Sequence, residues 1–144
     1  MKKLILTAFI AFGGMLAAQA QTPDVQPAAA ENPNPSELKF VKETHDFGSI
    51  PQGTPASYSF EFKNTGKSPL IITTASASCG CTTPEWTKEP INPGKKGTVK
   101  ATYNAASPGP FTKSITVMSN AKNSTVILYL KGDVKPAEQT KQPN

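Results

Sequence analysis

Apolar and polar residues alternate with a period of two through most of the stretch between residues 37 and 135. The clearest examples are the segments 57–62, 98–103 and 111–117, in which apolar side chains occupy nearly every second position. Such alternation places one face of each segment on a core and the other in water, which is typical of antiparallel strands. No apolar stripe with helical spacing persists for ten residues in this stretch. We therefore expect a domain built from strands.

Turn-forming residues separate the alternating segments, for example at 64–66, 92–94, 107–110 and 119–120. About seven short strands then fit into roughly a hundred residues, a pattern that predicts an all-β, immunoglobulin-like antiparallel β-sandwich. The run at 126–130 is apolar or aromatic at every position, so we expect it to form a central strand. The chain has two cysteines, only two positions apart, and it therefore lacks the inter-sheet disulfide of antibody domains.

The N-terminus has the features of an export signal. Residues 1–20 combine two lysines, an apolar run at 4–16 and the small residues Ala18 and Ala20. We predict that this segment is a signal peptide and that the mature protein is periplasmic or extracellular. Position 21 is Gln21 rather than cysteine. We therefore expect neither a lipid anchor nor stable membrane insertion after cleavage.

Composition divides the rest of the chain into three parts. Residues 21–36 are rich in Pro and Ala and carry hardly any large apolar side chain, so we expect a flexible spacer. Residues 136–144 are polar and are expected to form a disordered tail. Residues 37–135 carry nearly all the aromatic residues. They have room for a single immunoglobulin-like domain.

The charge of the chain argues against nucleic-acid binding. The sequence has 15 basic residues, every one a lysine, against 10 acidic residues, for a net charge of +5. Removal of the signal peptide with its two lysines leaves +5 − 2 = +3. The lysines are scattered and arginine, the residue favoured for phosphate and guanine contacts, is absent. We therefore predict no nucleic-acid partner.

Cys79 and Cys81, separated by Gly80, are the one concentrated chemical feature. On an extended strand their Cα atoms would stand about 6.6 Å apart, twice the strand rise. That is near the upper end of the roughly 4.4 to 6.8 Å that a disulfide tolerates. A disulfide here would close a very short loop and would therefore add little to the stability of the fold. Three interpretations stay open: a redox-labile disulfide, two thiolates that hold a soft metal ion, or two small residues that remain thiols or pack inward.

A metal site would draw on Cys79, Cys81 and His45, the single histidine. Structural zinc takes four ligands, so such a site would need a carboxylate, water or a second molecule as well. His45 precedes Asp46, but adjacent strand residues point to opposite faces and do not easily form an acid–base pair. The structural alternative is that His45 satisfies a backbone carbonyl or a turn while Phe47 fills the core.

Motifs of common enzymes are missing from the sequence. It contains neither the Gly-x-Ser-x-Gly elbow of serine hydrolases nor a phosphate-binding glycine loop. The single tryptophan, Trp86, is expected to cover one end of the sandwich core, with a platform for a sugar or peptide as the alternative. We therefore predict that the protein is not an enzyme.

Short motifs follow one another in a specific order through residues 37–135. They are His-Asp-Phe-Gly at 45–48, Phe-Glu-Phe-Lys-Asn-Thr-Gly at 60–66, Pro-Leu-Ile-Ile at 69–72, Ser-Cys-Gly-Cys-Thr-Thr-Pro at 78–84, Ile-Asn-Pro-Gly at 91–94, Tyr-Asn at 103–104, Ser-Asn at 119–120 and Gly132. Together they resemble the bacterial domain-of-unknown-function family 1573. The resemblance implies exported immunoglobulin-like domains, distantly similar to those of abnormal-spindle, hydin and major sperm proteins. It implies no agreed activity.

These observations favour a noncatalytic, secreted or periplasmic module that acts through a partner surface or an exposed strand edge. Its partner would be a protein, and it would need no cofactor. The alternative is a thiol-dependent function at Cys79 and Cys81, either binding of a soft metal such as copper or zinc or disulfide exchange. The sequence leaves the partner's identity and the oligomeric state open.

Overall fold

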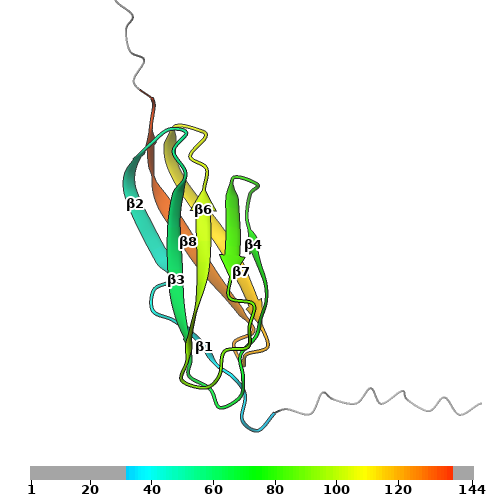
Figure 1. Ribbon diagram of the computed structural model, residues 1–144. Helices are drawn as coiled ribbons and strands as arrows, with labels where there is room; N and C mark the ends of the chain where they lie inside the picture. The colour runs from blue at the N-terminus through cyan, green and yellow to red at the C-terminus, as the bar shows by residue number, and fades with distance from the viewer. Residues whose placement is uncertain (1–31, 138–144) are drawn as a thin grey trace, which may run out of the picture. The chain divides into compact units, whose positions relative to one another are not determined.

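A computed structural model describes residues 32–137 of the protein, and these residues form a β-sandwich of eight strands (Figure 1). The predicted signal peptide lies outside the described residues, as do most of the predicted spacer and tail. None of the described residues belongs to a helix long and apolar enough to cross a membrane. The strands are β1 (Leu38–Phe40), β2 (Thr44–Pro51), β3 (Ala56–Asn64), β4 (Ile72–Ala77), β5 (Thr82–Trp86), β6 (Lys96–Tyr103), β7 (Gly109–Ser119) and β8 (Thr125–Lys135).

The strands form two four-stranded sheets. The first sheet has the order β1-β3-β6-β5 and the second the order β2-β8-β7-β4. The predicted all-β sandwich is confirmed, and β8 is a central strand as expected. Five of the six strand pairs are antiparallel, but β2 runs parallel to β8. A period-two pattern is the same for either direction, so pairing between strands far apart in the sequence could not be predicted from it.

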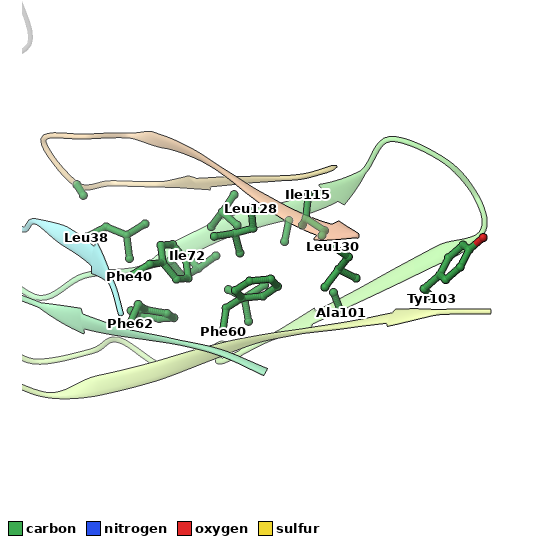
Figure 2. Packing of buried hydrophobic residues seen from close by; sticks show 14 of the residues in the cluster. Leu38, Phe40, Phe60, Phe62, Ile72, Ala101, Tyr103, Ile115, Leu128 and Leu130 are labelled. Carbon is green, nitrogen blue, oxygen red and sulfur yellow. The ribbon is translucent and has the colours of Figure 1, made fainter. Parts of the chain in front are cut away.

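The core lies between the inner faces of the two sheets, where the alternating apolar residues meet. Figure 2 shows Phe60 of β3 across from Leu128 and Leu130 of β8, and these side chains and Phe62 are fully buried. Burial of each such side chain stabilises the fold by roughly 1.5–3 kcal/mol. Gly97 leaves room for the Phe62 ring, because a Cβ at this position would stand 2.5 Å from Phe62 Cζ.

One end of the sandwich, which we call the asparagine end, is held by three side-chain amides. Asn64 is fully buried, and it donates to the carbonyls of Ser68 (2.7 Å) and Ile91 (2.9 Å). Its Oδ1 accepts from the backbone amides of Glu37 (3.3 Å) and Gly66 (3.0 Å). This one side chain therefore joins the start of the domain to the β3–β4 and β5–β6 connections.

Asn120 and Asn123 secure the same end from the β7–β8 connection. Asn120 accepts from the amide of Ile71 (2.8 Å) and donates to the carbonyl of Pro69 (3.1 Å). Asn123 pairs with both backbone groups of Leu38, at 3.0 and 2.6 Å. These bonds tie the short edge strand β1 and the β3–β4 loop to the second sheet.

The packed domain begins earlier than its composition suggests. Residues 32–36 belong to the predicted flexible spacer, yet Ser36 is 2% exposed and its hydroxyl contacts Asn120 at 3.3 Å. The carbonyl of Pro35 accepts from the amide of Lys67 (3.1 Å). Gly66 allows this approach, because a Cβ there would stand 2.4 Å from that carbonyl oxygen. Hydrogen bonds of the backbone hold residues 32–36 against the domain. The apolar content of this segment therefore did not indicate that it is packed.

Candidate functional site

Cys79 and Cys81 lie in the loop between β4 and β5, which carries the chain from the second sheet to the first. Their Sγ atoms form a disulfide, and their Cα atoms stand 5.3 Å apart. That distance is shorter than the 6.6 Å or so of an extended strand, because the segment turns: the amide of Thr82 points to the carbonyl of Cys79 at 3.4 Å. We call this segment, residues 78–82, the cysteine loop.

Backbone hydrogen bonds anchor the cysteine loop on both sides. The amide of Ser78 donates to the carbonyl of Ser114 (2.9 Å), and the amide of Ser114 donates to the Ser78 hydroxyl (3.2 Å). The amide of Asn104 donates to the carbonyl of Cys81 (2.9 Å). The loop is thus held to β7 and to the β6–β7 connection by bonds that do not involve sulfur.

The two sulfurs have different surroundings. Both cysteines are half-buried, and Cys81 packs against the hydrophobic core. Cys79 instead contacts the hydroxyl of the buried Thr82, with 3.9 Å between Sγ and Oγ1. Gly80, between them, is exposed, and nothing lies within 4 Å of where its Cβ would be. The disulfide is therefore open to solvent on the Gly80 side and closed by the core on the other.

A lysine shares this end of the sandwich. Ala77 pairs with Ile115 in the β4–β7 ladder, and the next residue, Ser78, bonds to Ser114, the chain neighbour of Lys113. The Lys113 ammonium lies 5.9 Å from the centre of the Tyr103 ring, and Tyr103 is the ladder partner of Thr82. A positive charge thus lies at the same end of the sandwich as the disulfide.

His45 lies away from the cysteine loop. It belongs to β2, whereas the loop begins at β4, and β8 and β7 separate these two strands. The imidazole stacks on Tyr58 of the first sheet, with 3.7 Å between ring centres. The structure does not bring His45 together with the cysteines. Among residues 32–137, no group of three or more His, Cys, Asp or Glu side chains is arranged to hold a metal ion.

The surroundings of His45 are those of a structural side chain. Its Nδ1 is buried and has no hydrogen-bond partner, so the expected bond to a backbone carbonyl or turn is not formed by this atom. Phe47 packs edge-on to the imidazole at 4.6 Å and against the core, as expected for Phe47. Burial, and next the charge of Lys42, hold the pKa of His45 below its usual value, while Asp46 opposes them.

Asp46 does not form an acid–base pair with His45. Its carboxylate accepts from the amide of Gly48 (2.8 Å) and lies 3.4 Å from the Lys131 ammonium on the outer face of the second sheet. The Gly48 amide, followed by Lys131, holds the pKa of Asp46 below its usual value. Gly48 adopts a positive φ of 63°, which suits glycine and allows the strand to bend here.

Trp86 closes the edge where β4 and β5 meet. The indole is half-buried and packs against the core, and its Nε1 donates to the carbonyl of Ile72 (3.2 Å). The Lys88 ammonium lies 3.1 Å above the ring centre. The predicted role of Trp86 as a cover of the core agrees with these contacts.

A group of exposed apolar residues was missed by the sequence argument. Met118, Ile127 and Tyr129 are 46%, 43% and 40% exposed, and they lie on the outer face of the second sheet. We call them the outer-face cluster. The run at 126–130 is apolar or aromatic at every position, but only Val126, Leu128 and Leu130 pack in or against the core. The large apolar side chains at the outward-facing positions of β8, Ile127 and Tyr129, were the signal that could have revealed the cluster.

The comparisons with known proteins identify the family. A family model described as a protein of unknown function, DUF1573, matches residues 38–134. The chain belongs to this family. The match confirms the resemblance seen in the motif series, which includes the Cys-Gly-Cys segment. No curated protein matches the chain in sequence.

Solved structures with the same fold share little sequence with this family member. A protein of unknown function from Porphyromonas gingivalis W83 is similar with a TM-score of 0.59 at 17% identity; the match covers 69% of this chain and 46% of that one. The human CEP192 ASH/PapD-like domain is similar with a TM-score of 0.60 at 10% identity, over 91% of this chain and 100% of that one. The chain thus spans about half of the first relative and all of the second. At these identities the likeness concerns the fold alone.

Proposed function

We propose that the chain is an exported, noncatalytic β-sandwich module that binds a protein partner through the outer face of its second sheet. The outer-face cluster carries this proposal. Large apolar side chains that stay exposed on the middle of a sheet face are typical of interaction sites when they lie together. The fold match to the CEP192 domain, over 100% of that domain and 91% of this chain, supports a single β-sandwich module.

The surroundings of the cluster suggest the chemistry of the partner. In the β7–β8 ladder Ile127 lies opposite Thr116, Tyr129 opposite Ser114, and Met118 opposite Thr125. These neighbours are polar but uncharged. On this face Lys131 and Asp46 form a pair at 3.4 Å. We therefore expect the partner to present an uncharged surface with an apolar centre and a rim of hydrogen-bonding groups.

In-cell cross-linking with a matched set of variants tests the proposal. The full chain is expressed in its host with a photo-cross-linker at Thr116, beside the cluster. The wild type and a Thr83→Lys control, exposed on the other sheet, should give a discrete adduct with a second protein. The Met118→Lys/Ile127→Lys double variant should lose it, because desolvating two charges opposes docking.

Two outcomes would contradict this function. One is an adduct that persists at wild-type level in the double variant, since the cluster would then take no part in binding. The other is an adduct that contains only a second copy of this chain, together with a dimer in sedimentation velocity. Circular dichroism of each variant confirms that the sandwich is intact, so that loss of the adduct reports on the surface.

A further inference from the structure

The Cys79–Cys81 disulfide contributes little to holding the fold. The two residues are separated by two positions in the sequence. The entropy that a cross-link removes from the unfolded chain grows with loop length, and it is small for a loop of this size. The cysteine loop is also tied by three hydrogen bonds of backbone amides, two that join Ser78 to Ser114 and one from Asn104 to the carbonyl of Cys81. The bond can therefore open without loss of the sandwich.

We propose that Cys79–Cys81 is a redox-active disulfide that accepts two electrons from a dithiol on a protein or peptide. This inference does not rest on the proposed binding function, because it involves the end of the sandwich rather than the outer-face cluster. The disulfide is open on the Gly80 side, where there is space for an approaching thiolate. Cys79 is the sulfur attacked, since Cys81 packs against the core.

The exchange takes place in two balanced steps. A thiolate of the incoming dithiol attacks Cys79 Sγ, the bond between the two sulfurs breaks, and its electron pair leaves on Cys81 Sγ, which takes up a proton. The second thiolate of the dithiol then attacks the dithiol sulfur that is bound to Cys79. The bond to Cys79 breaks, and Cys79 leaves with its electron pair as a thiolate. The dithiol is now a disulfide and the C-G-C pair is reduced.

Thr82 and Lys113 are positioning residues for this chemistry. The Thr82 hydroxyl, 3.9 Å from Cys79 Sγ, can donate to the thiolate that leaves in the second step. The Lys113 ammonium lies near Tyr103, the ladder partner of Thr82, and favours a negative charge at this end of the sandwich. Both groups stabilise the reduced pair relative to the disulfide, and a stabilised reduced form makes a disulfide more oxidising.

Redox titration of the full chain tests the inference. The protein is equilibrated with reduced and oxidised glutathione, alkylated, and its reduced fraction read from intact mass. Thr82→Val and Lys113→Gln should each lower the equilibrium constant for reduction by roughly three- to tenfold. The controls Thr83→Val, one position along β5, and Lys39→Gln, at the asparagine end, should leave it unchanged. Equal constants in all five proteins would overturn the roles of Thr82 and Lys113.

Single-cysteine variants test which sulfur exchanges. Cys81→Ser keeps Cys79, and it should form a mixed disulfide with oxidised glutathione at least several-fold faster than Cys79→Ser, which keeps the core-facing Cys81. The opposite order would overturn the assignment of Cys79. Circular dichroism is recorded before and after reduction of the wild type. Reduction that requires denaturant, or that unfolds the sandwich, would overturn the redox proposal itself while leaving the cross-linking result untouched.

Discussion

The two ends of the sandwich are secured in different ways. At the asparagine end, side-chain amides of Asn64, Asn120 and Asn123 bond to backbone groups of connections that come from both sheets. At the opposite end, the cysteine loop carries a covalent bond that joins residues only two positions apart. The noncovalent bonds at the asparagine end therefore join distant segments of the chain, whereas the covalent bond at the opposite end is local.

This difference separates stability from chemistry. A hydrogen bond between segments far apart in the sequence holds tertiary structure, and a buried backbone group left without its partner costs about 1–3 kcal/mol. A disulfide across one residue constrains almost none of the unfolded chain. We infer that the asparagine end stabilises the domain, whereas the cysteine loop is free to change its bonding. Four predictions test the comparison, beginning with the largest expected effect.

Replacing Asn64 with alanine should destabilise the domain most. The change removes four hydrogen bonds from a fully buried position, and only the Ile91 carbonyl keeps a second partner, the Leu70 amide. We expect the free energy of unfolding to fall by about 3 kcal/mol or more, measured by urea denaturation. Asn92→Ala is the matched control at an exposed turn position and should change it by less than about 0.5 kcal/mol. Equal losses in both variants would contradict the special role of Asn64.

Asn123→Ala should have a smaller and more local effect. Its amide holds both backbone groups of Leu38, so the substitution frees β1 from the β7–β8 connection. We expect a loss of about 2 kcal/mol in the free energy of unfolding. Hydrogen exchange should become faster in β1 first, because short edge strands open locally. Uniformly faster exchange across both sheets would show instead that Asn123 supports the whole domain.

Removal of the disulfide should cost less than either asparagine. The Cys79→Ser/Cys81→Ser double variant loses a cross-link of a very short loop, and we expect a decrease of about 1.5 kcal/mol or less in the free energy of unfolding. Urea denaturation of this variant is compared with that of the reduced wild type, which should agree with it. A loss greater than that of Asn64→Ala would reverse the comparison between the two ends.

Protonation of His45 should give the smallest effect. Its pKa in the folded protein lies below the usual 6.5, because burial and Lys42 disfavour the imidazolium. The unfolded chain therefore binds the proton more readily, and stability should fall as the pH drops below about 6.5 towards the folded-state pKa. The melting temperature between pH 7.5 and 5.5 measures this change. His45→Phe, which keeps the aromatic stacking, should remove part of the pH dependence.

The same pH experiment sharpens the comparison when it is combined with the end variants. His45 stacks between β2 and β3, away from the cysteine loop. Its effect should therefore add to that of the Cys79→Ser/Cys81→Ser change within about 0.5 kcal/mol, as expected for distant sites. A clear departure from additivity would indicate that the two sites are coupled.

The candidate site was only partly predictable from the sequence. Cys79 and Cys81 are identified by their spacing alone, because that spacing is a local property of the chain. The contributions of Thr82 and Lys113 could not be predicted from the sequence. The first depends on how the loop turns, and the second on the packing of Lys113 beside Tyr103. The sequence also carries no sign that β8 and β7 separate the strand of His45 from the strand that leads to the cysteines.

Two features of the fold also lay beyond the sequence pattern. The parallel pairing of β2 with β8 joins strands that are separated in the sequence by most of the domain. The alternation of apolar and polar residues is the same for parallel and antiparallel strands, so it does not indicate strand direction. The docking of residues 32–36 depends on backbone hydrogen bonds, which composition does not record. Both required the positions of residues that are distant in the sequence.

The sequence by itself determined that this protein is a β-sandwich, and largely which residues face its core, because the period of two is set by the geometry of the strand. Phe60, Phe62 and Leu128 follow that period and are buried. Only the tertiary structure decided which strands lie side by side, which apolar residues stay on the surface, and which groups surround the disulfide. The physical reason is that those properties depend on register between distant segments, and each register is chosen by the packing of the whole domain.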